Sequence, residues 1–202
     1  SAGPGIALGP LSPTITADGY AYSSVSVEFE RAKRVATLTV RAPEQPVEQT
    51  PEAIVAAGDQ FWPLRMFREL DDAILRLRVN EREIGTIVLK ASGDAARVLE
   101  ADQVLLDHTD HWLVREITHF IKRTLKRVDL SARSFFAVIE PGNAFAGSLF
   151  ELALAADRSY MLDDPDQPNS VQLSPMNAGV LPMSNGISRL QARFYGAPDQ
   201  VG

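Results

Sequence analysis

The chain has 202 residues, no cysteine and a formal net charge of −6 at pH 7. This length suits one domain with a substantial buried core. The lack of cysteine excludes disulfides, thiolate nucleophiles and cysteine-bound metals. An acidic chain without a long basic run is not typical of nucleic-acid-binding proteins. No apolar stretch approaches the ~18 residues of a membrane span, so we expect a soluble, cytoplasmic protein without a membrane partner.

The first 20 residues contain three prolines and four glycines. Their apolar positions are too few and too irregular for a helix or strand of any length. We therefore expect residues 1–20 to be a linker that lacks regular secondary structure and packs little against the domain at residues 21–202. The chain starts without Met and without the basic and apolar regions of a signal peptide, which indicates a cut or processed end.

The next segments alternate between strand and helix patterns. Residues 25–29 have a period of two and are followed, after a polar turn, by the apolar run at 35–40, which predicts a hairpin. Apolar residues recur at helical spacing over 62–79 and over a longer helical region at 104–128. Strands separated by amphipathic helices predict a βαβ-type α/β architecture.

Residues 134–162 are the most informative segment, because they predict a buried strand, a glycine turn and a helix. Phe135–Ile139 is a continuous run of apolar residues, and Pro141-Gly142 ends it. Strong helix formers follow from Ser148. A helix that begins there directs its unpaired N–H groups and the positive end of its dipole at the turn. Because Gly147 has no side chain, a ligand carbonyl can approach the backbone closely.

The stretch GNAFAGSLFELALAADR at 142–158 resembles the turn and helix of the crotonase (enoyl-CoA hydratase/isomerase) superfamily. The resemblance extends to VATLTVRAP at 35–43, IGTIVLKASGD at 84–94 and VQLSPMNAGVLPMSNGISRL at 171–190. It implies a crotonase-like ββα spiral with a mainly parallel sheet wrapped by helices, and a homo-oligomer. Relatives continue into C-terminal helices beyond the point where this chain stops, so we expect a truncated domain.

Three further segments resemble the C-terminal half of the family of benzoyl-CoA-dihydrodiol lyases: FWPLRMFRELDDAIL, DHWLVRE and IEPGNAFAG with ELALAADRSY. These enzymes of aerobic benzoate breakdown open an oxygenated, dearomatised benzoyl-CoA ring and release formate. The resemblance implies an acyl-CoA thioester as substrate, with coenzyme A as part of the substrate and no separate cofactor. It also implies that an N-terminal crotonase-like half in the same polypeptide is a partner of this chain.

Crotonase relatives polarise a thioester carbonyl between two backbone N–H groups, which form an oxyanion hole. By resemblance the donors are Ser148, directly after Gly147, and Leu99 in RVLEAD. Glu100 then stands where the family commonly has glycine. A backbone donor tolerates any side chain except proline, but these larger residues restrict access for an acyl-CoA.

Glu151 corresponds to the first of two catalytic carboxylates in hydratases, and it is our candidate for proton transfer. The alternative is a residue in the first turn of a helix that complements the helix dipole. The second carboxylate position falls on Pro175, so hydration by a pair of glutamates is not expected. With Gly147 and Pro175, Asn185 is a candidate substrate contact, or else it caps the following helix.

His108, His111 and His119 are the histidines of the chain. No HExxH or comparable motif accompanies them, so we predict no metal site. Three functions remain open. The chain is the C-terminal half of a benzoyl-CoA-dihydrodiol lyase with a degenerate site, a non-catalytic scaffold or dimerisation domain that braces a catalytic partner, or an independent enoyl-CoA hydratase or isomerase. The missing second carboxylate argues against the third.

Overall fold

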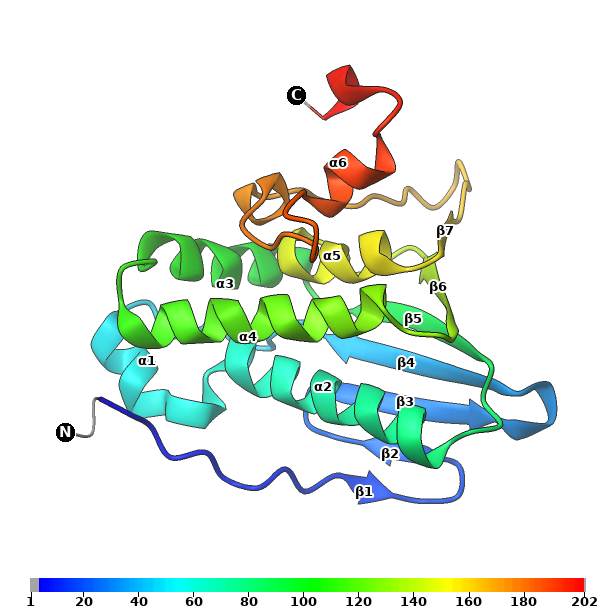
Figure 1. Ribbon diagram of the computed structural model, residues 1–202, viewed down its shortest axis with the longest axis horizontal. Coiled ribbons are helices and arrows are strands. Elements are labelled where there is room, and N and C mark those ends of the chain that lie inside the picture. Colours follow the sequence, from blue (N-terminus) through cyan, green and yellow to red (C-terminus); the bar gives the residue numbers. More distant parts are fainter. Residues whose placement is uncertain (1–3, 202) are drawn as a thin grey trace.

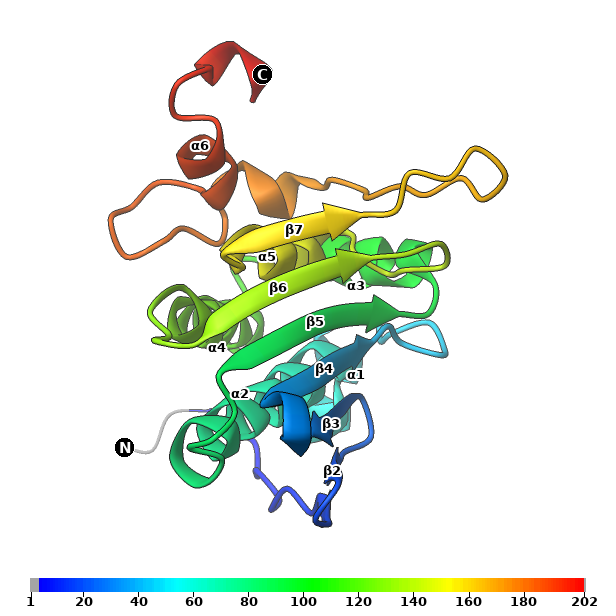
Figure 2. The same ribbon diagram turned by 90° about the vertical axis from the view of Figure 1, so that its right-hand side faces the viewer.

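Residues 4–201, which the computed structural model describes, build one sheet of seven strands in the order in which they follow along the chain (Figures 1 and 2). The strands are β1 (Thr14–Ile15), β2 (Gly19–Ala21), β3 (Val25–Glu30), β4 (Val35–Arg41), β5 (Thr86–Ser92), β6 (Ser134–Ile139) and β7 (Arg158–Met161). The helices pack on one face of this sheet (Figure 2). Among the described residues, no helix has both the length and the apolar character needed to cross a membrane.

The sheet combines two kinds of strand pairing. The pairs β1–β2, β2–β3 and β3–β4 are antiparallel. The predicted hairpin is β3 and β4 and is confirmed, with Val27 opposite Leu38. β4 to β7 run parallel, each joined to the next through helical connections on the same side. The predicted α/β class is therefore confirmed. The parallel part is the one that leads to the glycine turn.

The helices are α1 (Pro51–Ala57), α2 (Trp62–Asn80), α3 (Ala95–Asp107), α4 (Trp112–Asp129), α5 (Gly147–Ala155) and α6 (Arg189–Arg193), with short 3-10 turns η1 (Arg31–Lys33), η2 (Gly58–Gln60), η3 (Pro175–Ala178) and η4 (Pro198–Gln200). The helix predicted at 62–79 is confirmed as α2. The single helical region predicted at 104–128 is wrong. Its backbone leaves the helix at His108 and enters a new one after His111, because polar turn residues interrupt the apolar stripe there.

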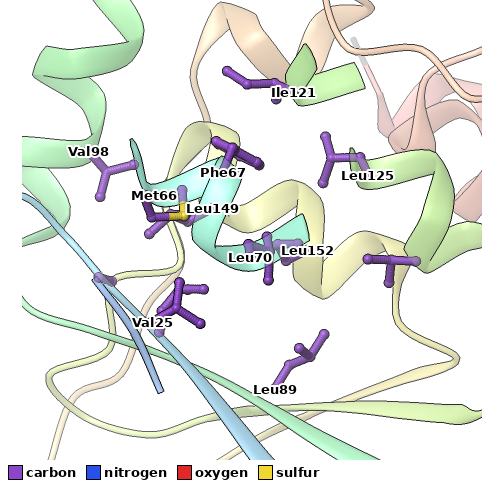
Figure 3. Packing of buried hydrophobic residues seen from close by; sticks show 14 of the residues in the cluster. Val25, Met66, Phe67, Leu70, Leu89, Val98, Ile121, Leu125, Leu149 and Leu152 are labelled. Atoms are coloured by element: carbon purple, nitrogen blue, oxygen red, sulfur yellow. The ribbon is translucent and has the colours of Figure 1, made fainter. Parts of the chain in front are cut away.

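The core lies between the sheet and the four longer helices. Every second residue of β4 and β5 is fully buried, such as Leu38 and Leu89, while the residues between them are half-buried on the other face. Figure 3 shows Leu70 of α2 with Leu149 and Leu152 of α5 above Leu89. Each such side chain contributes about 1.5–3 kcal/mol by leaving water. This packing fixes α5 against the sheet.

The expectation of an unstructured linker at residues 1–20 is wrong for part of that range, and residues 1–3 lie outside the described residues. β1 and the first two residues of β2 fall within it. The Gly9 amide donates to Asp59 Oδ2 at 2.6 Å, and Arg68 Nη2 donates to the Gly9 carbonyl at 2.7 Å. Tyr20 is buried, and its hydroxyl donates to Glu81 at 2.7 Å. Hydrogen bonds to α2 and its neighbours thus hold a segment that has few apolar residues.

The glycine turn and its buried carboxylates

The predicted turn at 146–148 is confirmed. β6 ends at Ile139, Ala146 is extended, and α5 begins at Gly147. Gly147 has φ +43°, a left-handed conformation that L side chains rarely adopt. The turn lies at the carboxyl end of a strand with a parallel neighbour on each side, which is where open α/β sheets place their ligand sites.

A carboxylate of the chain itself occupies the space in front of this turn. Asp102, from α3, accepts a hydrogen bond from the Ser148 amide at 2.7 Å and another from Ser174 Oγ at 3.3 Å. A Cβ atom added to Gly147 would lie 1.9 Å from Asp102 Oδ2. The bare glycine therefore admits the Asp102 carboxylate, where the sequence predicted the approach of a substrate carbonyl. The Ser148 donor is present but already engaged.

Burial dominates the electrostatics of Asp102, of which 1% is exposed. Loss of hydration raises the pKa of this carboxyl to about 7, although the hydrogen bonds from Ser148 and Ser174 act in the opposite direction. The nearby carboxylate of Glu151 raises it further. Near neutral pH, Asp102 therefore exchanges between its neutral and its charged form.

The other predicted oxyanion donor is misplaced. Leu99 is the fifth residue of α3, which begins at Ala95 after the N-cap Asp94. At that depth in an α-helix an amide donates to the carbonyl four residues earlier, here that of Ala95. The Leu99 N–H is therefore committed to the helix, because Asp94 starts α3 before Leu99 is reached.

Glu151 is 1% exposed and is the fifth residue of α5. It is thus one turn beyond the position that would complement the helix dipole, and that interpretation is wrong. Its Oε1 accepts from Asn177 Nδ2 at 2.7 Å, and its Oε2 accepts from Arg189 Nη1 at 2.8 Å. Burial raises the pKa of the Glu151 carboxyl, against the effect of Asn177 and Arg189.

Arg189 is the centre of this network and is itself 2% exposed. Its Nε and Nη2 donate to the two oxygens of Asp129 at 2.9 and 2.6 Å, a bidentate pair with the end of α4. Its Nη1 also donates to the Leu181 carbonyl at 2.9 Å. One guanidinium therefore joins α4, α5 and the segment around α6.

The remaining predicted contacts do not meet the turn. Pro175 is exposed and starts η3. Asn185 is also exposed, and its side chain accepts from the Ile187 amide at 3.3 Å. The cap of α6 is Ser188 and not Asn185. Beside Pro175 it is Asn177 that reaches into the turn, where its Nδ2 donates to the Gly147 carbonyl at 2.9 Å as well as to Glu151.

Sequence reasoning missed four residues that build the site: Asp102, Asp129, Asn177 and Arg189. Asp102 and Asn177 lie in RVLEAD at 97–102 and SPMNAG at 174–179, the segments that contain Leu99 and Pro175. No short-range pattern identifies the partners of these two residues. Arg189 lies 38 residues from Glu151 and 60 from Asp129. Only the packing of α4, α5 and α6 brings these charges together.

One cavity borders the site, and another lies apart from it at the end of β4. The first, of about 300 Å³, is lined by Leu173, Ser174, Asn177 and Leu190, and it meets the outer residues of the network. The second, of about 390 Å³, has Arg41, Gln60, Trp62 and Arg65 in its wall. The Glu151 carboxylate lines neither cavity.

No family model matches the chain. The chain is 49% identical over 191 residues to benzoyl-CoA-dihydrodiol lyase of Aromatoleum evansii. The matched region covers 95% of this chain and 34% of the lyase. The chain thus spans about a third of the length of this curated relative. Its structure is similar to an enoyl-CoA hydratase from Geobacillus kaustophilus, with a TM-score of 0.56 and 16% identity over 91% of this chain and 61% of that chain. It is also similar to an enoyl-CoA hydratase from Bacillus anthracis, with a TM-score of 0.53 and 16% identity over 84% of this chain and 58% of that chain. These two similarities show the fold, which is that of the crotonases.

Proposed function

We propose that the chain, a crotonase-fold homologue of part of benzoyl-CoA-dihydrodiol lyase, is a segment of a lyase of that type. Such an enzyme opens an oxygenated, dearomatised benzoyl-CoA ring and releases formate. The similarity to the lyase supports this proposal because it extends over nearly the whole chain. The lyase is about three times as long as the matched segment, which is consistent with a second crotonase-like half as a fused partner.

The cavity at the end of β4 supports a CoA thioester as ligand. Arg41 and Arg65 line it together with Glu44 and Glu48, and Arg65 Nε is buried without a hydrogen-bond partner among the described residues. Guanidinium groups are well suited to phosphate oxygens, and coenzyme A carries several. Trp62 adds an aromatic surface beside them. We assign the phosphates of the thioester to this cavity.

Within the lyase we assign to this segment a bracing role and not proton transfer. The observation that carries this assignment is the Asp102 carboxylate bound to the Ser148 amide. An oxyanion hole must offer free donors to the developing charge, and a general base must reach the substrate. Here the donor is occupied, and both oxygens of Glu151 are bound by Asn177 and Arg189. Proton transfer then belongs to the partner half.

Catalysis by Glu151 is the second candidate, and one observation favours it. Two buried carboxyls with raised pKa values, Asp102 and Glu151, lie at one turn, and such shifts concentrate at active sites. Access to Glu151 would require η3 and α6 to move away. An independent hydratase remains disfavoured, because the second carboxylate position is occupied by Pro175.

Glu151→Gln in a lyase-length enzyme tests the assignment. Glutamine keeps the size of Glu151 and one of its two accepted hydrogen bonds, and it removes the charge opposite Arg189. We therefore expect a loss of stability, while turnover of the CoA thioester by the folded enzyme remains within about twofold. Glu116→Gln, on the exposed face of α4, is the matched control. A loss of ~100-fold or more, typical of removing a general acid or base, in enzyme that remains folded, would instead make Glu151 catalytic.

A further inference from the structure

Three arginines surround a small cavity at the end of the molecule opposite the glycine turn. Arg78 near the end of α2, Arg127 near the end of α4, and Arg133 just before β6 line a space of about 10 Å³. Arg78 and Arg127 each lie in the last turn of their helix. The chain as a whole is acidic, so this local excess of positive charge needs an explanation.

Arg133 has a buried donor atom that lacks a partner among the described residues. Its Nη1 is buried without a hydrogen-bond partner among residues 4–201, and its Nη2 makes only a long 3.5 Å contact with the Arg78 carbonyl. Burial lowers the pKa of this guanidinium, although the charge of Glu81 acts in the opposite direction. Arg133 as a whole is half-buried, but a buried donor atom without an acceptor is costly to a fold.

The carboxylates in the neighbourhood are already engaged. Asp71 forms an ion pair with Arg127 at 2.7 Å. Glu81 accepts from Arg31 at 2.8 Å and from the Tyr20 hydroxyl at 2.7 Å. Among the described residues, no carboxylate lies within ion-pair distance of Arg78 or Arg133, so the charge of these two side chains is available to a ligand.

Apolar side chains make up most of the cavity lining, and exposed apolar residues follow lining residues on both helices, which we call the apolar rim. Leu75 lines the cavity, and Val79 follows one turn later on the same side of α2. Leu130 follows Arg127 by three residues at the end of α4. Val79 is 61% exposed and Leu130 is 73% exposed. The interior has room for about one water-sized atom, so a ligand can insert one oxygen and must leave its remaining part at this apolar rim.

We propose that this cavity is a binding site for a carboxylate that carries an apolar group. One carboxylate oxygen occupies the cavity against Arg133 Nη1, the other faces Arg78, and the apolar group lies between Val79 and Leu130. Phosphate fits less well, because it is larger and more strongly hydrated and has no apolar part. The site lies at the opposite end of β6 from the glycine turn, and it does not depend on the function proposed above.

Titration calorimetry of the 202-residue chain with hexanoate, acetate and inorganic phosphate tests this site. We expect saturable binding of hexanoate, weaker binding of acetate, and none of phosphate. Arg133→Gln should weaken hexanoate binding about tenfold or more, since a hydrogen bond between charged groups is lost. Arg82→Gln, an exposed arginine of the same end that does not line the cavity, should change binding less than about twofold.

Leu130→Ser provides an independent variant at an exposed position, which should fold even if Arg133→Gln does not. It should reduce the preference for hexanoate over acetate. A peptide with one aspartate between two leucines distinguishes the sources of the carboxylate. Tighter binding of the peptide than of hexanoate would assign the site to an acidic protein segment, and the reverse to a small molecule. Absence of saturable binding, equal binding of phosphate, or equal effects of Arg133→Gln and Arg82→Gln would overturn the proposal.

Discussion

Asp102 ionises near neutral pH, so its ionisation affects the stability of the folded state in the pH range of ordinary assays. Its pKa is about 7 in the fold and near 4 in an unfolded chain. Between these values the folded state keeps a proton that the unfolded state has lost, so stability falls as pH rises from about 4 to 7. Each pKa unit corresponds to ~1.4 kcal/mol, which makes the total effect a few kcal/mol. Denaturant unfolding at a series of pH values measures it.

Asp102→Asn isolates this contribution, because asparagine keeps an acceptor for the Ser148 amide and has no proton to lose. We expect the variant to be more stable than the parent at pH 8 and to show a flatter pH profile. Asp110→Asn, an exposed position, should leave the profile unchanged. We expect the parent protein to lose stability from pH 4 to 7. A gain of a few kcal/mol over this range would contradict a raised pKa of Asp102.

Gly147 is required for two separate reasons, its positive φ and its contact with Asp102. Gly147→Ala would place a Cβ atom 1.9 Å from Asp102 Oδ2. We expect a loss of several kcal/mol, above the about 1–2 kcal/mol of a left-handed backbone alone. Gly142 also has a positive φ, but the space around it is open. Gly142→Ala should therefore lose only the about 1–2 kcal/mol of the backbone conformation. Adding Asp102→Ala to Gly147→Ala should recover part of the difference in the free energy of unfolding, because a 2.9 Å contact with Ser174 Oγ remains.

Among the elements, η3 and α6 depend on Arg189 for their position. Removing this side chain leaves Glu151 and Asp129 buried and without their ionic partner. Loss of one partner of a buried pair costs about 3–5 kcal/mol. We expect Arg189→Ala to lose that much stability, and the amides of residues 174–193 to exchange with deuterium much faster than in the parent.

Arg193→Ala on the same helix is the control. Arg193 is exposed and donates only to carbonyls of Leu154 and Ala156. Its replacement should cost less than about 1 kcal/mol. If Arg189→Ala and Arg193→Ala had similar effects on exchange, the packing of apolar side chains such as Met176 and Leu181, and not the ionic network, would fasten this segment.

At the scale of the whole molecule, several large apolar side chains remain exposed around one edge of the sheet and beyond it. Tyr160, Met161 and Leu162 belong to β7 or follow it, and β7 pairs with β6 on one side only. An edge strand of this kind tends to associate. We therefore predict self-association, measured by sedimentation velocity over a range of concentrations.

The double variant Tyr160→Lys with Leu162→Lys should reduce this association, because charge on an edge strand opposes pairing. Leu8→Lys replaces another exposed apolar residue away from that edge and should leave association unchanged. A parent chain that stays monomeric at high concentration would remove the basis for an oligomer.

The amino-acid sequence by itself determined the α/β class and several of the elements, but not the break between α3 and α4 or the strands β1 and β2. The alternating hairpin, the amphipathic pattern of α2 and the strand, glycine and helix around Gly147 are local signals, because hydrophobic period and backbone freedom depend on neighbouring residues. Residues 1–20, which the sequence predicted to be a linker, show the limit of such local signals. Their hydrogen bonds to Asp59, Arg68 and Glu81 join residues about 50 to 60 positions apart.

Only the tertiary structure decided the state of the site. The sequence located the turn and Glu151, but it predicted free oxyanion donors at Leu99, which lies within α3, and at Ser148, which is bound by Asp102. Whether that donor is free depends on Asp102, 46 residues away, and the ionisation of Glu151 depends on Arg189. Burial and long-range pairing of charges are properties of packing, because they arise where separate elements meet and no short segment contains both partners.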